Sequence, residues 1–187
     1  MAGRHSAPVL ESKSPMFKIT TEKPEHAGAI ETLLDAAFGA DRQAKISYSF
    51  RQDVERVTPL CLVALDEDGA LGATIRYWPI LIGAAPALLL GPIAVAEAQR
   101  SAGLGGKLIK CSLDRARTLG YRIVVLVGDE PYYGHFGFHP ASQHGIVMPQ
   151  ENPARVLVLS IAPSNRDALP SGPIGPWRSV RRVSAAA

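Results

Sequence analysis

The sequence predicts a single α/β domain in which a mixed, mostly antiparallel central sheet of about six to seven strands is flanked by helices. Apolar residues make up 47% of the 187 residues and charged residues 20%, the composition of an ordinary globular domain. Residues 60–80 have the pattern of a β-hairpin, and an amphipathic helix over 103–119 stands between two apolar strands. The chain is too short for two large domains, so we expect one domain over 15–162.

The N-terminal third predicts one strand followed by two helices. Residues 17–20 form a short strand pattern, Pro24 suits the first turn of a helix, and Gly39 can end that helix in a left-handed conformation. The apolar residues of the first helix share one face: Ala27, Ile30, Leu33, Leu34, Ala37 and Phe38. A second, weaker helical pattern covers 42–57, where apolar side chains recur every four residues.

The hairpin is followed by a strand that breaks a local rule. Residues 60–65 and 71–80 are its two strands, and the turn residues 66–69 join them. The next strand, 87–95, is apolar enough to be central, yet it carries Gly91-Pro92 in its interior. Because proline cannot donate a ladder hydrogen bond, we expect a bulge or a lost neighbour there. Such breaks tend to mark functional sites.

The second half alternates helices and strands. Apolar side chains fill about half the circumference of the helix over 103–119, Gly120 ends it, and 122–127 is a continuous β-branched run typical of a buried strand. A short helix over 132–136 and strands near 145–148 and 155–161 follow. We expect residues 1–14 to be a flexible leader and 163–187 an irregular tail.

Composition excludes several classes of protein. The formal net charge of +3 permits an anionic ligand but does not indicate a nucleic-acid binder. Cys61 and Cys111 stand far apart in apolar settings, which excludes a disulfide framework and a cysteine-rich metal site. The polar N-terminus has no secretory signal, and glycine and proline interrupt the apolar stretch 80–95, so we expect no membrane segment and a cytoplasmic location.

Residues 99–108 carry the strongest chemical signal. Glycines let a ligand approach the backbone, and the first amide groups of the following helix have no intrahelical partner, so the loop is suited to a phosphate. A P-loop would need glycine at Ser101 and a hydroxyl residue at Leu108, and the dinucleotide fingerprint would need glycine at Leu108. Both motifs therefore fail.

The pattern Arg100-x-x-Gly103-x-Gly105, together with the later Tyr133…Gly137-Phe138, resembles the GCN5-related N-acetyltransferase (GNAT) superfamily. The resemblance runs from about Phe17 to Ile161. It implies acetyl-CoA as cosubstrate, bound where two parallel strands, 87–95 and 122–127, splay apart. It also implies that backbone groups at the end of the first strand hold the pantetheine, namely Ile93, Ala94 and Val95. The pyrophosphate would then be bound by backbone amides of Arg100, Ser101, Ala102, Gly103, Leu104, Gly105, Gly106 and Lys107.

The family reaction is direct attack of an amine on the thioester. Tyr133 aligns with the tyrosine that commonly protonates the departing thiolate, although the adjacent Tyr132 stays open as the acid. An amine of pKa ~10.4 must lose its proton first, at a cost of about 4–5 kcal/mol at pH 7. Some members of the family carry an acidic residue on this strand as the base, but the strand 87–95 contains none. Asp129 and Glu130 are the candidates to replace it, unless they form a solvated turn.

The sequence leaves the acceptor and two rival functions open. The acceptor is a small-molecule or peptide amine, and regions 42–57, 80–86 and 140–153 are the candidates for its pocket. A non-catalytic acyl-CoA-binding module on the same fold is the first rival. The second is a DNA-binding domain that uses 103–122 as its recognition helix. We expect no metal, because His135, His139 and His144 resemble turn histidines. A homodimer stays open.

Overall fold

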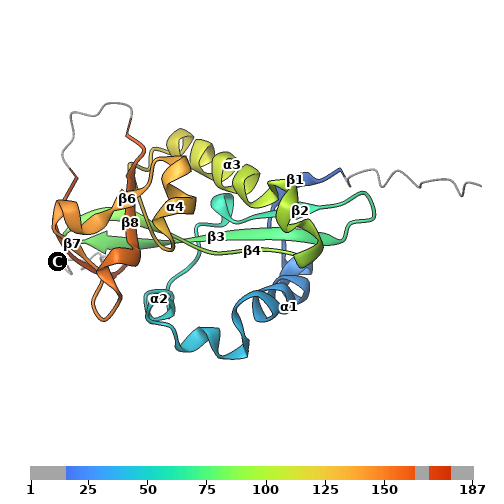
Figure 1. The fold of residues 1–187 in the computed structure, drawn as a ribbon, viewed down its shortest axis with the longest axis horizontal. Coiled ribbons are helices and arrows are strands. Elements are labelled where there is room, and N and C mark those ends of the chain that lie inside the picture. The colour runs from blue at the N-terminus through green and yellow to red at the C-terminus, as the bar shows by residue number, and fades with distance from the viewer. Residues whose placement is uncertain (1–15, 163–168, 178–187) are drawn as a thin grey trace, which may run out of the picture.

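The computed structural model describes residues 16–162 and 169–177. Two long strands, β3 (Leu71–Ile82) and β4 (Ala85–Val95), run through the middle of the molecule (Figure 1). Helices α1 and α2 lie on one face of them and helices α3 and α4 on the other. The predicted flexible leader, 1–14, lies outside the described residues.

The main sheet has the strand order β1-β2-β3-β4-β5-β8-β6. Its other bounds are Lys18–Thr21 (β1), Leu62–Leu65 (β2), Ile123–Val127 (β5), Val156–Ser160 (β8) and His139–Pro140 (β6). Along this path β4 and β5 are parallel, and all other neighbours are antiparallel. The predicted fold class is therefore confirmed.

Two strands lie off this path. Strand β9 (Gly172–Pro176) pairs antiparallel with the second half of β3 and parallel with β7 (Ile146–Val147). The prediction of an irregular tail is therefore wrong for 172–176, while 163–168 and 178–187 lie outside the described residues. Proline and glycine are rare in strands, but this one gains its backbone partners from β3 and β7, and it buries Ile174 against Ile82.

The helices agree with the sequence except over 42–57. Helix α1 (Ala27–Phe38) ends at Gly39, and α3 covers Leu104–Thr118. The expected second helix is instead a 3₁₀ turn, Ala40–Ala44, followed by the short α2 (Ile46–Ser49). Lys45 between them has an extended backbone (φ −66°, ψ 140°), which interrupts the helix. The short helix α4 (Glu130–Tyr133) and a 3₁₀ turn end at Gly137, with φ +90°.

The apolar face of α3 builds the main core against the sheet. Its buried side chains pack against β2, β3 and β4, with each buried leucine contributing about 1.5–3 kcal/mol. Inside this core, the hydroxyl groups of Tyr77 and Ser112 share a 2.8 Å hydrogen bond. On the other face, Ile30 and Leu34 of α1 pack against Val63 and Ala94.

No helix within 16–162 and 169–177 combines the length and apolar character that crossing a membrane requires.

Candidate active site

The site is built around a β-bulge in strand β4. Ile75 of β3 faces Ile93, but the next paired positions are Tyr77 and Leu90. Arg76 therefore stands opposite two residues, Gly91 and Pro92, which is the bulge that the sequence predicted. Gly91 has φ +124°, a backbone conformation that residues other than glycine rarely adopt.

Beside the bulge, β4 and β5 part. They pair only at Leu88–Val124 and Leu89–Val125. Beyond these pairs a cavity of about 500 Å³ opens between the strands. Residues 89–93 of β4 line it on one side, and residues 126–129 at the end of β5 line it on the other. The gap in the middle of the sheet thus follows from the interrupted strand.

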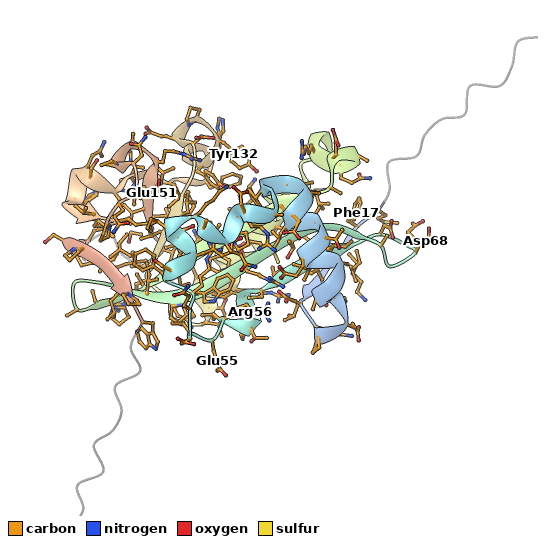
Figure 2. All side chains as sticks on the ribbon, turned by 90° about the horizontal axis from the view of Figure 1, so that it is seen from below. Phe17, Glu55, Arg56, Asp68, Tyr132 and Glu151 are labelled. Atoms are coloured by element: carbon orange, nitrogen blue, oxygen red, sulfur yellow. The ribbon has the colours of Figure 1, made fainter. Side chains whose placement is uncertain are left out.

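Two segments distant in sequence complete the cavity wall. The α2 segment contributes residues between Arg42 and Arg51, and the 150 loop contributes Gln150 and Glu151. Figure 2 shows Glu151 on the side of the molecule that also carries Tyr132. Three regions were expected to form the acceptor pocket. Two of them, 42–57 and 140–153, contribute residues to this cavity. The third, 80–86, contributes no residue to this cavity.

The N-terminus of α3 lies next to the end of β4. Gly103 occupies the N-cap with φ +67° and no side chain caps the helix, so its first amide groups lack an intrahelical partner. A Cβ on Gly105 would lie 3.2 Å from Val95 Cγ2 and 3.9 Å from Ile93 Cδ1. The structure therefore brings 93–95 and 100–107 together, and a side chain at Gly105 would crowd them.

The two tyrosines of α4 occupy different places. Tyr133 lines the cavity, and burial raises its pKa to about 12. Tyr132 is 46% exposed, and its hydroxyl lies 3.2 Å from the position of a Cβ on Gly105, at the start of α3. Only Tyr133 therefore faces the gap between β4 and β5.

Acidic residues at the cavity differ from the predicted set. Asp129 lines the cavity, with Oδ1 3.4 Å from Arg155 Nε, whereas Glu130 is exposed and does not line it. Glu151 lines the cavity and was missed by the sequence analysis. The segment 140–153 was selected as a candidate region, but no charge pattern within it marks this residue.

Arg51 is a second residue that the sequence analysis missed. Its Nε and Nη1 atoms are buried without a hydrogen-bond partner, and its guanidinium carbon lies 4.0 Å from the centre of the Tyr48 ring and 4.9 Å from that of Trp78. Burial lowers the pKa of Arg51 to about 10. The local sequence, Ser49 to Asp53, is polar and gives no signal of this position.

The predicted turn histidines include a close pair. The Nε2 atoms of His139 and His144 lie 2.9 Å apart. Over 16–162 and 169–177, no group of three or more metal-ligating side chains is present.

Comparison with known proteins places this geometry in context. Residues 27–138 match the profile of the Acetyltransferase (GNAT) family. The chain is 33% identical over 130 residues to the N-acetyltransferase YhbS of Escherichia coli K12, covering 68% of this chain and 77% of that protein. It is 29% identical over 125 residues to the N-acetyltransferase YjhQ of the same organism, covering 65% and 68%.

Two solved structures have the same architecture. The crystal structure of E. coli YhbS in complex with CoA superposes with a TM-score of 0.75 at 28% identity, covering 91% of this chain and 92% of that one. A GNAT family acetyltransferase from Brucella melitensis in complex with acetyl-CoA gives a TM-score of 0.66 at 29% identity, covering 87% and 96%.

Proposed function

Because this chain belongs to the Acetyltransferase (GNAT) family, we propose that it transfers the acetyl group of acetyl-CoA to a primary amine by direct attack on the thioester. Two observations together carry the proposal: strands β4 and β5 part beside a bulge, and the uncapped N-terminus of α3 lies at the end of β4. The two solved relatives bind CoA and acetyl-CoA, which supports this cosubstrate.

The cosubstrate would be held by backbone groups. Beyond Leu89, β4 has no described partner on the β5 side, which supports binding of the pantetheine along Ile93, Ala94 and Val95. The free amides at the start of α3, with the preceding residues from Arg100, would bind the pyrophosphate. The positive end of the helix dipole adds to this attraction.

Tyr133 is the proposed general acid. The amine nitrogen forms a bond to the acetyl carbon, the carbon–sulfur bond breaks, and the Tyr133 hydroxyl donates its proton to the departing thiolate. Its position in the cavity wall supports this role over Tyr132. Before the attack, the acceptor ammonium would pass one proton to a cavity carboxylate, Asp129 or Glu151, which frees the nitrogen lone pair. The second proton that the nitrogen loses on forming the amide would return to the Tyr133 phenolate.

The direct test has two parts. Isothermal titration is expected to detect acetyl-CoA binding, and a thiol-release assay across an amine library is expected to detect transfer. Absence of binding at millimolar acetyl-CoA would exclude the proposal. Binding without transfer to any amine would instead support the non-catalytic acyl-CoA-binding module.

A charge placed at the α3 N-cap tests the pyrophosphate site. We expect Gly103→Asp to weaken acetyl-CoA binding by about tenfold or more, because its carboxylate would accept from the free amides and repel the diphosphate. Gly103→Asn is the matched control, since it has the same shape without the charge, and both residues tolerate the left-handed backbone. Equal dissociation constants for the two variants in titration would contradict a phosphate site here.

A methyl group at Gly128 tests the placement of Tyr133. A Cβ there would lie 2.2 Å from Cε2 of the Tyr133 ring, so Gly128→Ala must displace the ring. We expect kcat to fall by about tenfold or more, while acetyl-CoA binding is retained. Gly134→Ala is the control, because it has open space around it in the same segment. Unchanged kcat in Gly128→Ala would show that the ring position is not needed.

A further inference from the structure

The cavity wall contains a partly buried cation for which the proposed reaction has no role. Arg51 lines the cavity, and neither its buried Nε nor its buried Nη1 has a hydrogen-bond partner. We propose that Arg51 binds a carboxylate carried by the acceptor, so that the substrates are amines with a free carboxylate, such as amino acids. This inference rests on the proposed acetyl transfer and names its substrate class.

The neighbouring arginines show what Arg51 lacks. Arg42 donates to Asp35 Oδ1 at 2.8 Å and to Tyr48 Oη at 3.1 Å, and it also pairs with Glu31. Arg76 and Arg155 have carboxylate partners as well. Arg51 has no ion pair with any described residue. A partly buried charge without a counter-ion is costly, and a carboxylate in the cavity would supply a counter-ion.

The position of Arg51 suits an acceptor substrate. Its Nη2 lies 3.7 Å from the point that a Cβ on Gly91 would occupy, so the guanidinium stands beside the bulge in β4. The proposed thioester site lies at this same bulge. An acceptor held by its carboxylate at Arg51 would therefore keep its amine within the cavity where transfer takes place.

The surroundings of Arg51 favour a carboxylate over a larger anion. The rings of Tyr48 and Trp78 lie against the guanidinium, and its Nε and Nη1 are buried, so a ligand would approach Arg51 at Nη2, the nitrogen beside the bulge, where a small carboxylate can pair with it. Arg42 donates a hydrogen bond to the Tyr48 hydroxyl, which fixes the position of that ring. Asp129 and Glu151 also line the cavity and offer negative charge to the ammonium group of the same molecule.

The test compares each L-amino acid with its own carboxamide as acceptor. For the wild type we expect kcat/KM to favour the free acid by about tenfold to a hundredfold, the range for a hydrogen bond to a charged group. Arg51→Gln is expected to bring this ratio to about one, because the loss should fall on the free acids. Arg117→Gln, which removes an exposed arginine paired with Asp114, is the control and should keep the wild-type ratio.

Binding gives a second readout that does not depend on turnover. The preferred amino acid should raise the melting temperature of the wild type in a thermal-shift assay, whereas its carboxamide should not, and Arg51→Gln should abolish the effect. A folding defect is controlled by the melting temperature of the free variant. It should change little, since the substitution removes a partly buried charge without a counter-ion together with its contacts to the Tyr48 and Trp78 rings.

Each result decides one of the two proposals. Acetylation of acids and carboxamides at equal rates would overturn the role of Arg51 and leave acetyl transfer standing. If Arg51→Gln lowered kcat/KM equally for the amino acids and for their carboxamides, the carboxylate role would also be overturned. Arg51 would then act on the thioester and not on the acceptor. Amino-acid binding that needs Arg51, with no acetylation of any amine, would retain the carboxylate site and exclude acetyl transfer.

Discussion

Replacing Tyr133 with phenylalanine is expected to lower kcat by about 100-fold or more, the range for loss of a positioned general acid. The variant keeps the buried ring and loses only the proton that the departing thiolate would take. We expect the KM for acetyl-CoA to change little, because the proposed pantetheine and pyrophosphate contacts are made by backbone groups. Steady-state kinetics with a saturating amine will measure the change.

The pH dependence of the wild type offers a check on the same residue. Burial raises the pKa of Tyr133 to about 12, so the phenol stays protonated at neutral and moderately alkaline pH. We therefore expect no loss of kcat from this group below about pH 11. Tyr132→Phe is the control, since Tyr132 is exposed and its hydroxyl lies near the start of α3 and not in the cavity. A larger loss in Tyr132→Phe than in Tyr133→Phe would reverse the assignment of the acid.

Replacing Arg76 with methionine is expected to destabilise the fold by about 3–5 kcal/mol, because it removes three hydrogen bonds to carboxylates and leaves the buried Glu22 with only Arg56 as an ion-pair partner. Arg76 Nε and Nη2 each donate to Glu22 at 2.8 Å, and Nη1 donates to Glu31 at 2.8 Å. The Glu22 side chain is only 6% exposed. In a chain of this size we expect the melting temperature to fall by roughly 6–20 °C, as calorimetry would measure.

A double variant separates the charge from the packing. Arg76→Met with Glu22→Gln removes both charges of the buried pair and should recover part of the lost stability, although Arg56 then loses its contact with Glu22. A single variant that loses less than about 1 kcal/mol would show that the pair contributes little.

The same ion pairs give the wild type a predicted acid sensitivity. Burial by itself would raise the pKa of Glu31, but hydrogen bonds from Arg76 and Arg42 outweigh it and lower that pKa below 4.5. A carboxylate with a lowered pKa contributes stability above its unfolded pKa and loses it as the pH falls through the folded value. Unfolding free energies measured below about pH 4.5 should therefore fall less steeply in Arg76→Met.

The centre of the site could be predicted because its signals are local. Gly91-Pro92 breaks the ladder wherever the strand lies, and the bulge in β4 with the gap beside it is the result. The loop before α3 likewise depends on adjacent residues. As predicted, α3 begins after Gly103, and no side chain caps its first amide groups. Backbone chemistry within ten residues explains both features.

The regions 42–57 and 140–153 could be proposed for the cavity wall, but the side chains that form it could not be predicted, because they depend on distant contacts. Arg51 and Glu151 are one hundred residues apart, and only the folded chain brings both to the same cavity. The helical spacing over 42–57 was real, but the extended backbone at Lys45 interrupts it, and Arg42 turns back to Asp35 and Glu31 on α1. Strand β9 depends on β3 and β7 and not on its own residues, two of which are prolines.

The pairing of β9 has a consequence for self-association. Ile80, Leu81 and Ile82 of β3 extend past β2, which pairs only with Leu71–Ile75, and on that side β9 occupies their backbone hydrogen-bonding positions. Without β9 this stretch would be an open, apolar sheet edge, the kind that recruits strands from neighbouring molecules and starts aggregation. By pairing there, β9 covers this edge of the sheet, which is a use of the segment that does not involve the cavity.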